Sequence, residues 1–295
     1  MSTVIVVGSI NVDLSIKVER LPSPGETVIG GTFAQTPGGK GGNQAAAAAR
    51  LGAETWMVGM VGDDTLGKSA LSDLREGGVD VSTVETCADP TGVASILVDR
   101  QGENLIAVAS GANDRLTPEG VGRALESLPV RGAAVLGVLE IPQEAVLAAA
   151  RAAQALGGVF VLNPAPAPDK PLDPELVAAC DVITPNEHEA RVLGSPKSLL
   201  EQGVKAVVVT RGAEGAEVWT SGAPVVRRPA FAVDAVDTTG AGDAFSAALA
   251  WAVAEGRRLE EAVTLAAATG ALSTRAWGAR AGLPTRVEVE ELARS

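Results

Sequence analysis

Short apolar runs alternate with Ala-rich amphipathic stretches along most of this chain, and that alternation restricts its fold more than any other feature. The runs lie at residues 4–7, 56–61, 134–141, 159–162, 182–184 and 207–210. Continuous apolar runs of this kind are typical of strands that are buried on both faces. The stretches between them, such as residues 43–51, 67–77 and 141–156, have the spacing of helices. The order predicts an α/β fold with a mostly parallel central sheet.

Two stretches depart from this pattern and predict a second, smaller sheet. Residues 14–36 contain two Pro and three Gly, and residues 92–111 alternate in polarity around a central turn. We expect both to form a β lid beside one domain that spans residues 1–295. A further hairpin is expected at residues 216–229, before a long Ala-rich helical region.

The net charge and the narrow set of catalytic side chains exclude several classes of function. The 295 residues include 24 Lys and Arg against 36 Asp and Glu, and the formal net charge of −12 repels a polyanion such as nucleic acid. The chain has one histidine, His188, and no tyrosine, so a catalytic triad or a His-rich metal site would depend on a single imidazole. We therefore expect catalysis by carboxylates, backbone amides and Lys or Arg.

Cysteine use and hydropathy indicate the compartment. Cys87 and Cys180 are the two cysteines, and their separation matches neither a thiolate metal site nor a disulfide framework. No apolar stretch approaches the roughly 20 residues of a membrane helix, and no basic region precedes the first apolar run. We expect a cytoplasmic protein with no signal peptide and no membrane segment.

Two glycine-rich segments imitate nucleotide-binding motifs but fail on physical grounds. Residues 62–69 satisfy the Walker A pattern, yet Asp63 and Asp64 would put two carboxylates where phosphates bind, so a capped helix start is the better interpretation. Residues 39–44 lack the final Gly of a dinucleotide fingerprint and follow an irregular segment instead of the first strand. Dinucleotide oxidoreduction is left as a remote alternative.

A third glycine-rich segment, DTTGAGD at residues 237–243, opens a helical run at 244–254. Small residues leave successive backbone amides bare at a helix N-terminus, and this arrangement makes an anion hole. Asp243 then lies beside the bound anion, where it either caps the helix or accepts a proton from a hydroxyl group. This segment alone supports the two interpretations equally, and the second one is phosphoryl transfer to an alcohol.

The segment at 39–44 is part of a longer one, PGGKGGNQA at residues 37–45, which places four Gly around Lys40 at the start of a helix, so that the backbone can approach a ligand closely. Asn11 and Asp13 follow the first strand, where α/β proteins bind ligands, and their side chains can bond to vicinal hydroxyls. The alternative for Asn11 is a turn residue with a satisfied side chain.

Six motifs taken together resemble the ribokinase/PfkB family of carbohydrate kinases. They are GSINVD at 8–13, PGET at 24–27, GGKGGNQA at 38–45, NPAP at 163–166, TPNEHE at 184–189 and DTTGAGDAF at 237–245, in the family order. The resemblance spans nearly the whole chain and implies a three-layer α/β/α domain with a small β lid. It also implies ATP-dependent phosphorylation of the primary hydroxyl of D-ribose, which gives D-ribose 5-phosphate and ADP.

The resemblance further implies roles for individual residues. Asp243 is expected to be the general base, with the amides of Gly240, Ala241 and Gly242 as the anion hole. The expected sugar-binding residues are Asn11, Asp13, Gly39, Lys40, Asn43 and Glu140, together with Asp243. The expected ATP-binding residues are Asn186, Glu189, Gly242 and the turn formed by Thr210, Arg211, Gly212, Ala213, Glu214 and Gly215.

Two cations are implied by the same resemblance. Asn186 and Glu189 are similar to the pair that organises Mg²⁺ and the ATP phosphates, with Glu189 acting indirectly. An activating K⁺ is expected next to the anion hole, held by Asp237, Thr239 and the carbonyls of Ser273, Ala276, Gly278 and Gly282. The chain departs from the family at Ala267, where an adenine-contacting Asn is frequent, and at Trp277 and Arg280.

Physical arguments bear on the substrate and on assembly. Lys40 is the one positive group expected among the sugar-binding residues, which favours an uncharged polyol over a sugar phosphate. A nucleoside would require aromatic side chains to pack against its base, and the chain has only four Phe and four Trp, which disfavours a nucleoside substrate. The alternatives are a sibling kinase that acts on fructose, deoxyribose or a nucleoside, and a non-catalytic sugar or nucleotide sensor. Exposed lid strands favour a homodimer that pairs two lids.

Overall fold

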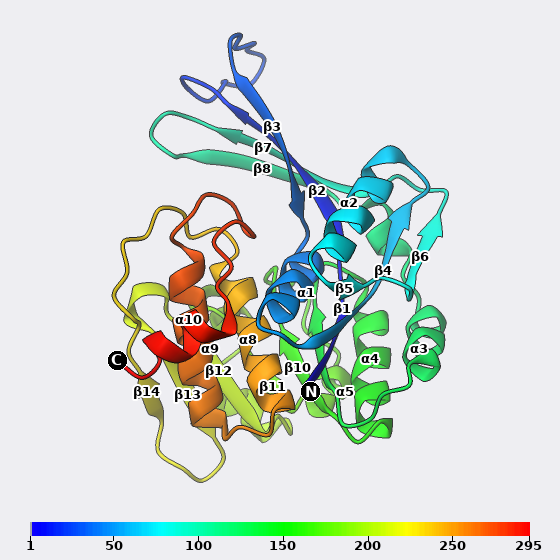
Figure 1. Ribbon diagram of the computed structural model, residues 1–295, viewed down its shortest axis with the longest axis vertical. Helices are drawn as coiled ribbons and strands as arrows, with labels where there is room; N and C mark the ends of the chain where they lie inside the picture. The colour runs from blue at the N-terminus through cyan, green and yellow to red at the C-terminus, as the bar shows by residue number, and fades with distance from the viewer. Residues whose placement is uncertain (1) are drawn as a thin grey trace.

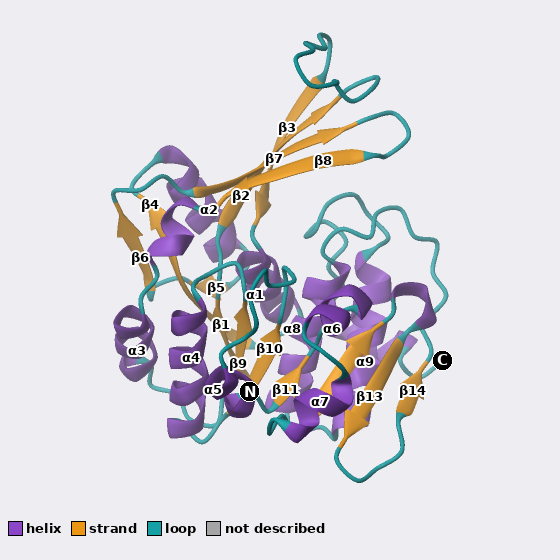
Figure 2. Cartoon of the chain, turned by 180° about the vertical axis from the view of Figure 1, so that it is seen from behind, coloured by secondary structure: helices purple, strands orange, loops and turns teal. Residues whose placement is uncertain are grey.

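The computed structural model describes residues 2–295 and arranges most of them as one large sheet with helices on both faces (Figures 1 and 2). The strand order is β14-β13-β12-β11-β10-β9-β1-β4-β5, and β6 also pairs with β4. The strands are β1 Thr3–Val7, β4 Glu54–Gly62, β5 Val79–Asp80, β6 Val84–Cys87, β9 Ala134–Val138, β10 Val159–Asn163, β11 Val182–Ile183, β12 Ala206–Thr210, β13 Ala216–Thr220 and β14 Val226–Arg228. All pairings are parallel except β12 with β13 and β13 with β14, which confirms the expected mostly parallel sheet and its terminal hairpin.

Helices cover the two faces of this sheet and divide the core into two clusters. The helices are α1 Lys40–Arg50, α2 Thr65–Glu76, α3 Pro118–Ser127, α4 Gln143–Ala155, α5 Pro174–Ala179, α6 Glu187–Val192, α7 Pro196–Glu201, α8 Ala241–Ala254, α9 Leu259–Ser273 and α10 Arg286–Leu292. In β1, Val4 and Val6 join the cluster of α1, α2, α8 and α9, while Ile5 and Val7 join that of α3, α4 and α5. Alternate side chains of one strand therefore enter opposite cores, which is why the run is apolar throughout.

A second sheet of four strands projects from the body in Figures 1 and 2. Its order is β3-β2-β7-β8, and its strands are β2 Asn11–Lys17, β3 Thr32–Gly38, β7 Gly92–Val98 and β8 Asn104–Ala109. Residues 18–31 between β2 and β3 form a loop. Because β2 begins soon after β1 ends, Asn11 stands at the junction of the two sheets. The small sheet expected from the sequence is confirmed.

The segment that imitates a Walker A motif is a capped helix start. Asp64 is the N-cap of α2, and its Oδ1 accepts a hydrogen bond of 2.7 Å from the Gly67 N–H. Its Oδ2 accepts another from the Thr91 N–H at 2.8 Å. The carboxylate thus occupies the amides that a phosphate would need, as the charge argument indicates.

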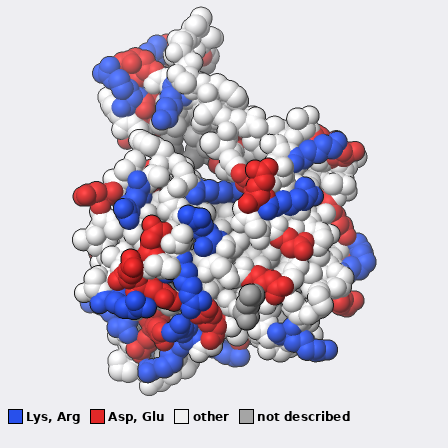
Figure 3. Space-filling model, viewed as in Figure 1, with Lys and Arg blue, Asp and Glu red and all other residues white. Residues whose placement is uncertain are grey.

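The surface charges are mixed. Figure 3 shows acidic and basic side chains interspersed over the body and gathered again at the tip of the small sheet. At that tip Arg20 pairs with Glu26, and Arg100 pairs with Glu19. Within residues 2–295 there is no helix both long and apolar enough to span a bilayer.

Candidate active site

Asp243 lies in the first turn of α8 and is buried, with 7% of its surface exposed. The helix begins after Gly240, whose φ of 76° is left-handed and therefore suits Gly. Within the described residues no backbone N–H of α8 donates to the Asp243 carboxylate. Its Oδ2 instead accepts from Asn43 Nδ2 at 3.1 Å, and its Oδ1 accepts from Gln44 Nε2 at 3.1 Å. The carboxylate is therefore held by α1 beside the N-terminus of α8 and does not cap the helix.

The electrostatics around Asp243 suit a proton acceptor. Burial raises the pKa of Asp243 above its usual range, and the opposing charge of Lys40 and the two amide donors limit that rise. Burial would lower the pKa of Lys40, but Asp243, Glu140 and other carboxylates more than compensate and raise it. A buried carboxylate with a raised pKa next to a firmly charged ammonium is an arrangement typical of general bases.

Glycines bring the N-terminus of α1 against the chain between β1 and β2. A Cβ at Gly39 would lie 2.6 Å from the Asn11 nitrogen, and a Cβ at Gly41 would lie 2.7 Å from the Ser9 oxygen. Ser9 Oγ donates to Glu140 Oε2 at 2.5 Å, and the Lys40 N–H donates to the same oxygen at 2.9 Å. The close approach therefore connects the glycine segment with the residues that follow β1 and β9.

The expected sugar-binding residues meet at this junction. Asp13 lies so close to Gly38 that a Cβ there would be 2.0 Å from its Oδ1. Burial, with the nearby charge of Glu140, raises the pKa of Asp13 to about 6, against the opposing charges of Arg280 and Lys40. Asn11 is buried, and its Oδ1 accepts from Asn113 Nδ2 at 2.7 Å. Carboxylate and amide groups in this arrangement suit a ligand with several hydroxyls.

A polar cavity of about 200 Å³ lies directly beside Asp243. It is lined by Lys40, Asn163, Ala165, Thr184, Asn186, Glu189, Thr210, Gly240, Gly242, Asp243 and Ser246. Several of these residues stand at the carboxyl ends of parallel strands, where open α/β sheets bind ligands. At the start of α8 the Ala241 N–H donates to the Thr238 carbonyl at 3.2 Å, while Gly240 and Gly242 line the cavity. The amides of these two glycines and the Lys40 ammonium are donors of the kind that phosphate oxygens need.

Asn186 and Glu189 form a capping box at the start of α6, at the edge of the polar cavity. Asn186 Nδ2 donates to Glu189 Oε1 at 2.8 Å, and the Asn186 N–H donates to Oε2 at 2.8 Å. Burial raises the pKa of Glu189. A carboxylate with both oxygens engaged fits a hydrated divalent cation held through its water ligands.

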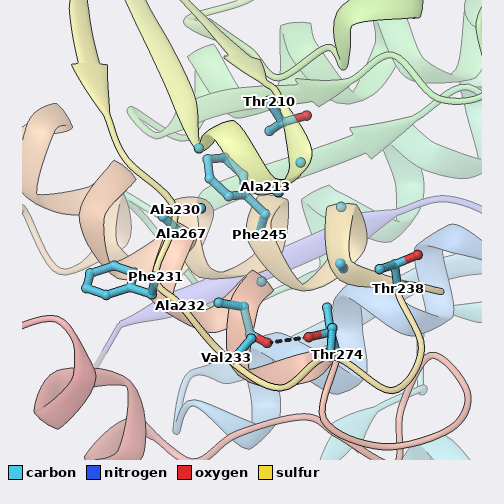
Figure 4. Close-up of a pocket in the computed structure, with 17 residues that line it drawn as sticks. Thr210, Ala213, Ala230, Phe231, Ala232, Val233, Thr238, Phe245, Ala267 and Thr274 are labelled. Carbon is cyan, nitrogen blue, oxygen red and sulfur yellow. Dashed lines mark hydrogen bonds between the residues drawn. The ribbon is translucent and has the colours of Figure 1, made fainter.

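A larger, mostly apolar cavity of about 440 Å³ adjoins the polar one and shares Thr210 and Gly242 with it (Figure 4). Its other lining residues are Gly212, Ala213, Gly215, Ala230, Phe231, Ala232, Val233, Ala235, Thr238, Ala241, Phe245, Ala267, Gly270, Ala271 and Thr274. Ala267 is one of these lining residues and contributes only a methyl group. The size and apolar lining suit the base and ribose of a nucleotide.

Two of the residues expected to bind ATP point elsewhere. Arg211 and Glu214 line neither cavity among the described residues. Arg211 Nε donates to Glu214 Oε2 at 3.1 Å, and Arg211 Nη2 pairs with Glu187 at 3.1 Å. These side chains therefore hold the turn after β12 in place, and its glycines and Ala213 face the cavity.

The expected K⁺ ligands converge on a loop next to the anion hole. Asp237 Oδ1 accepts from the Thr239 N–H and hydroxyl at 2.9 and 2.7 Å, and Oδ2 accepts from the Gly278 N–H at 2.8 Å. A Cβ at Gly282 would lie 2.1 Å from the Ser273 carbonyl oxygen and 3.4 Å from the Ala276 nitrogen, so these three residues are close together. Burial alone would raise the pKa of Asp237, but these donors outweigh it and lower the pKa. An ionised carboxylate is an oxygen ligand of the kind that a hard cation prefers.

Sequence reasoning missed several residues that hold the site. Gln44 and Ser9 lie within quoted motifs, so their positions next to expected site residues were a signal, whereas Asn113 lies in none of those motifs. Arg280 was noted only as a departure from the family pattern and was given no role, yet its Nε donates to Asn43 Oδ1 at 3.0 Å. Lys40 is the one positive residue of the expected sugar-binding set, and the folded chain brings a second positive group, the distant Arg280 guanidinium, next to that set.

Comparisons with known proteins agree with this geometry. The model of the family described as pfkB family carbohydrate kinase matches residues 1–286. The chain is 40% identical over 296 residues to a ribokinase of Bacillus subtilis, with 99% of each chain covered. It is 38% identical over 302 residues to a ribokinase of Haemophilus influenzae, covering 98% of this chain and 97% of that one.

Solved structures show the same fold. Arabidopsis thaliana ribokinase complexed with ribose and ATP is similar with a TM-score of 0.89 at 33% identity, covering 100% of this chain and 99% of that one. Thermotoga maritima ribokinase gives a TM-score of 0.89 at 32% identity, with 100% of both chains covered. These likenesses confirm the three-layer architecture with its small sheet.

Proposed function

This chain belongs to the pfkB family of carbohydrate kinases, and we propose that it transfers the γ-phosphoryl group of ATP to the primary hydroxyl of D-ribose. The products are D-ribose 5-phosphate and ADP. The buried Asp243 carboxylate carries the proposal, because it stands between a hydroxyl-binding junction and a polar cavity at a helix N-terminus. A sensor without catalysis has no use for a desolvated carboxylate that caps nothing.

In this mechanism the sugar lies at the junction of the two sheets, with its hydroxyls bonded to Asn11, Asp13 and Asn43. Asp243 accepts the proton of the primary hydroxyl as the oxygen attacks the γ-phosphorus in line with the leaving ADP oxygen. The amides of Gly240, Ala241 and Gly242 stabilise the charge on the transferred group. Gly39 and Glu140 hold the loop and the Lys40 backbone in position.

The nucleotide occupies the two adjoining cavities, with its base in the apolar one and its phosphates in the polar one. Lys40 and Thr210 face the phosphates, while Gly212, Ala213 and Gly215 form the wall beside the base. Asn186 and Glu189 would hold Mg²⁺ through water, and that ion would neutralise phosphate charge. Arg211 and Glu214 support the turn from outside.

We assign an activating K⁺ to Asp237, Thr239 and the carbonyls of Ser273, Ala276, Gly278 and Gly282. A cation held there would add positive field to the anion hole. The tight hydrogen bonding of Asp237 supports an ionised carboxylate at that position.

We also propose that two lids pair in a homodimer. The register places Ile16 opposite Phe33 and Leu97, and Leu97 opposite Leu105, so these four side chains form one row across the small sheet. Phe33 and Leu105 are 60% and 51% exposed. The row lies on the face opposite to Asp13, because side chains alternate along β2. An exposed apolar row on a projecting sheet favours burial against a second copy.

The free thiols of Cys87 and Cys180 support a cytoplasmic site of action.

ADP release measured with a panel of sugars tests the substrate. We expect turnover on D-ribose to exceed turnover on fructose, 2-deoxyribose and nucleosides. A higher kcat/KM on any of these would assign the chain to that sibling activity. The absence of ADP release with every sugar, at full Mg²⁺ and K⁺, would favour a sensor.

A further inference from the structure

Arg280 is a nearly buried guanidinium outside the groups that contact substrates in the proposed mechanism. It lies in the loop between α9 and α10, and only 14% of its side chain is exposed. Each of its three nitrogens has its own acceptor. Nε donates to Asn43 Oδ1 at 3.0 Å, Nη2 donates to the Gly38 carbonyl at 3.2 Å, and Nη1 pairs with Asp73 of α2. One side chain therefore joins α1, α2 and the end of the lid strand β3.

The space for this side chain depends on a glycine. A Cβ at Gly42 would lie 2.6 Å from Arg280 Nη2, so any other residue at that position would displace the guanidinium. The same loop donates the Gly278 N–H to Asp237 at 2.8 Å. The loop after α9 thus contacts both the cation ligands and the glycine segment at the start of α1.

The contact with Arg280 determines which end of the Asn43 amide faces Asp243. An ionised Asp243 only accepts hydrogen bonds, so it requires the NH₂ group of Asn43, and a guanidinium only donates, so it requires the oxygen. Only one rotamer of the amide satisfies both neighbours. Without Arg280 the amide oxygen loses its donor, and rotation of the amide would turn that oxygen toward the carboxylate.

We propose that Arg280 is a positioning residue for phosphoryl transfer, which fixes the Asn43 amide so that its NH₂ group is directed at Asp243. The proposal rests on the proposed role of Asp243 as the general base. The guanidinium also adds a positive charge beside Asp243 and Asp13, and this charge favours the ionised form of both. Arginine stays charged when buried, so both effects persist through the working pH range.

Two substitutions separate the geometric effect from the charge. Arg280→Met removes both, and we expect kcat to fall roughly 10- to 100-fold, the scale of a lost hydrogen bond to a charged group, with little change in the KM for ATP. The acid limb of the kcat profile should move to higher pH, because Asp243 loses a favourable charge and a directed donor. Arg280→Lys keeps the charge without the planar fork, so kcat should fall while the acid limb moves less than in Arg280→Met.

Arg275→Met is the matched control, because Arg275 is an exposed arginine of the same loop. It should leave kcat and the acid limb unchanged. Asp73→Asn removes the anchor of the guanidinium on α2 and should lower kcat in the same direction as Arg280→Met, and the double variant should lose less than the sum. If Arg280→Met fails to fold, Arg280→Lys and Asp73→Asn carry the test.

Wild-type kcat and an unmoved acid limb in Arg280→Met, with only a lower melting temperature, would overturn the proposal and leave a structural role. Asp243→Asn assayed in parallel keeps the two claims apart. An inactive Asp243→Asn beside a fully active Arg280→Met refutes the positioning role alone. A fully active Asp243→Asn refutes the base itself, on which the positioning role depends.

Discussion

Asn43 Nδ2 donates a 3.1 Å hydrogen bond to Asp243 Oδ2, and so joins the first turns of two helices that lie 200 residues apart in the chain. Both residues are buried, with 7% of each exposed. The bond places an amide donor on the oxygen pair that must take up a proton. It therefore orients the carboxylate and favours its ionised form at the same time.

Asp243→Asn is expected to remove the proton acceptor while the fold persists. Loss of a general base lowers kcat by roughly 10² to 10⁴ with substrate binding little changed. The melting temperature at neutral pH should stay the same or rise, because burial raises the pKa of this carboxyl and so makes its ionised form costly in the folded state. Steady-state kinetics and a melting curve check both.

The control for this variant is Asp169→Asn, which neutralises an exposed carboxylate and should leave kcat unchanged. Turnover of Asp243→Asn within a few-fold of the original protein would show that the proton is accepted elsewhere. A large fall in the melting temperature would instead indicate that the carboxylate stabilises the fold.

The fold was predictable from the sequence where strands are buried on both faces. In β1 the four consecutive apolar residues Val4 to Val7 enter the two cores alternately, and the unbroken apolar run indicates this burial. The strands β5, of two residues, and β6, of four, were not predicted, because such segments are too short to show a periodic pattern. The helix α3 was also missed, since its two glycines weaken the helical pattern.

The site was predictable only as far as local motifs extend. The segment at 237–243 left open whether Asp243 caps α8 or accepts a proton, and the answer required Asn43 and Gln44 from another helix. Arg280 belongs to no motif, and its 237-residue separation from Asn43 gives no local pattern. Arg211 lies in the turn expected to bind ATP, but its side chain pairs with Glu187 and Glu214 instead of lining the cavities. The sequence could not show this, because the pairing with Glu187 depends on how the chain folds.

K⁺ is expected to activate the enzyme through the Asp237 loop. In tetramethylammonium buffer kcat should be low and should rise when K⁺ is added, because the cation strengthens the field at the anion hole. Asp237→Asn should remove most of this response, since the site loses its negative charge. Rates measured with and without K⁺ at constant ionic strength decide the matter, and equal rates would remove K⁺ from the mechanism.

Disruption of the apolar row on the small sheet should separate the homodimer. Phe33→Glu combined with Leu105→Glu places two charges on the proposed interface, and burial of unpaired charge is costly. Light scattering should change from twice the chain mass to 29.7 kDa. Thr32→Glu, on the other face of β3, is the matched control and should remain dimeric. A wild-type protein that is monomeric at micromolar concentration would contradict the proposal directly.

Asp13 is expected to couple sugar affinity to pH, because its pKa is raised to about 6 by burial and by the charge of Glu140. Above that pH the ionised carboxylate accepts hydrogen bonds from two sugar hydroxyls, and protonation below it removes acceptors. The dissociation constant for ribose, measured by calorimetry, should therefore increase as pH falls through about 6. Asp13→Asn should bind ribose weakly at every pH and should discriminate less between ribose and 2-deoxyribose.

Asp13→Asn is expected to weaken sugar binding but to stabilise the fold. A carboxyl whose folded pKa lies above its unfolded value destabilises the fold once pH exceeds the folded pKa, and costs nothing below the unfolded pKa. Asp13→Asn should therefore melt higher than the original protein above pH 6, and the gain should vanish as pH falls toward 3.8, the ordinary pKa of an aspartate. A variant that melts lower at pH 8 while its sugar preference is unchanged would make Asp13 a turn residue, because its carboxylate would then stabilise the loop and contribute nothing to recognition.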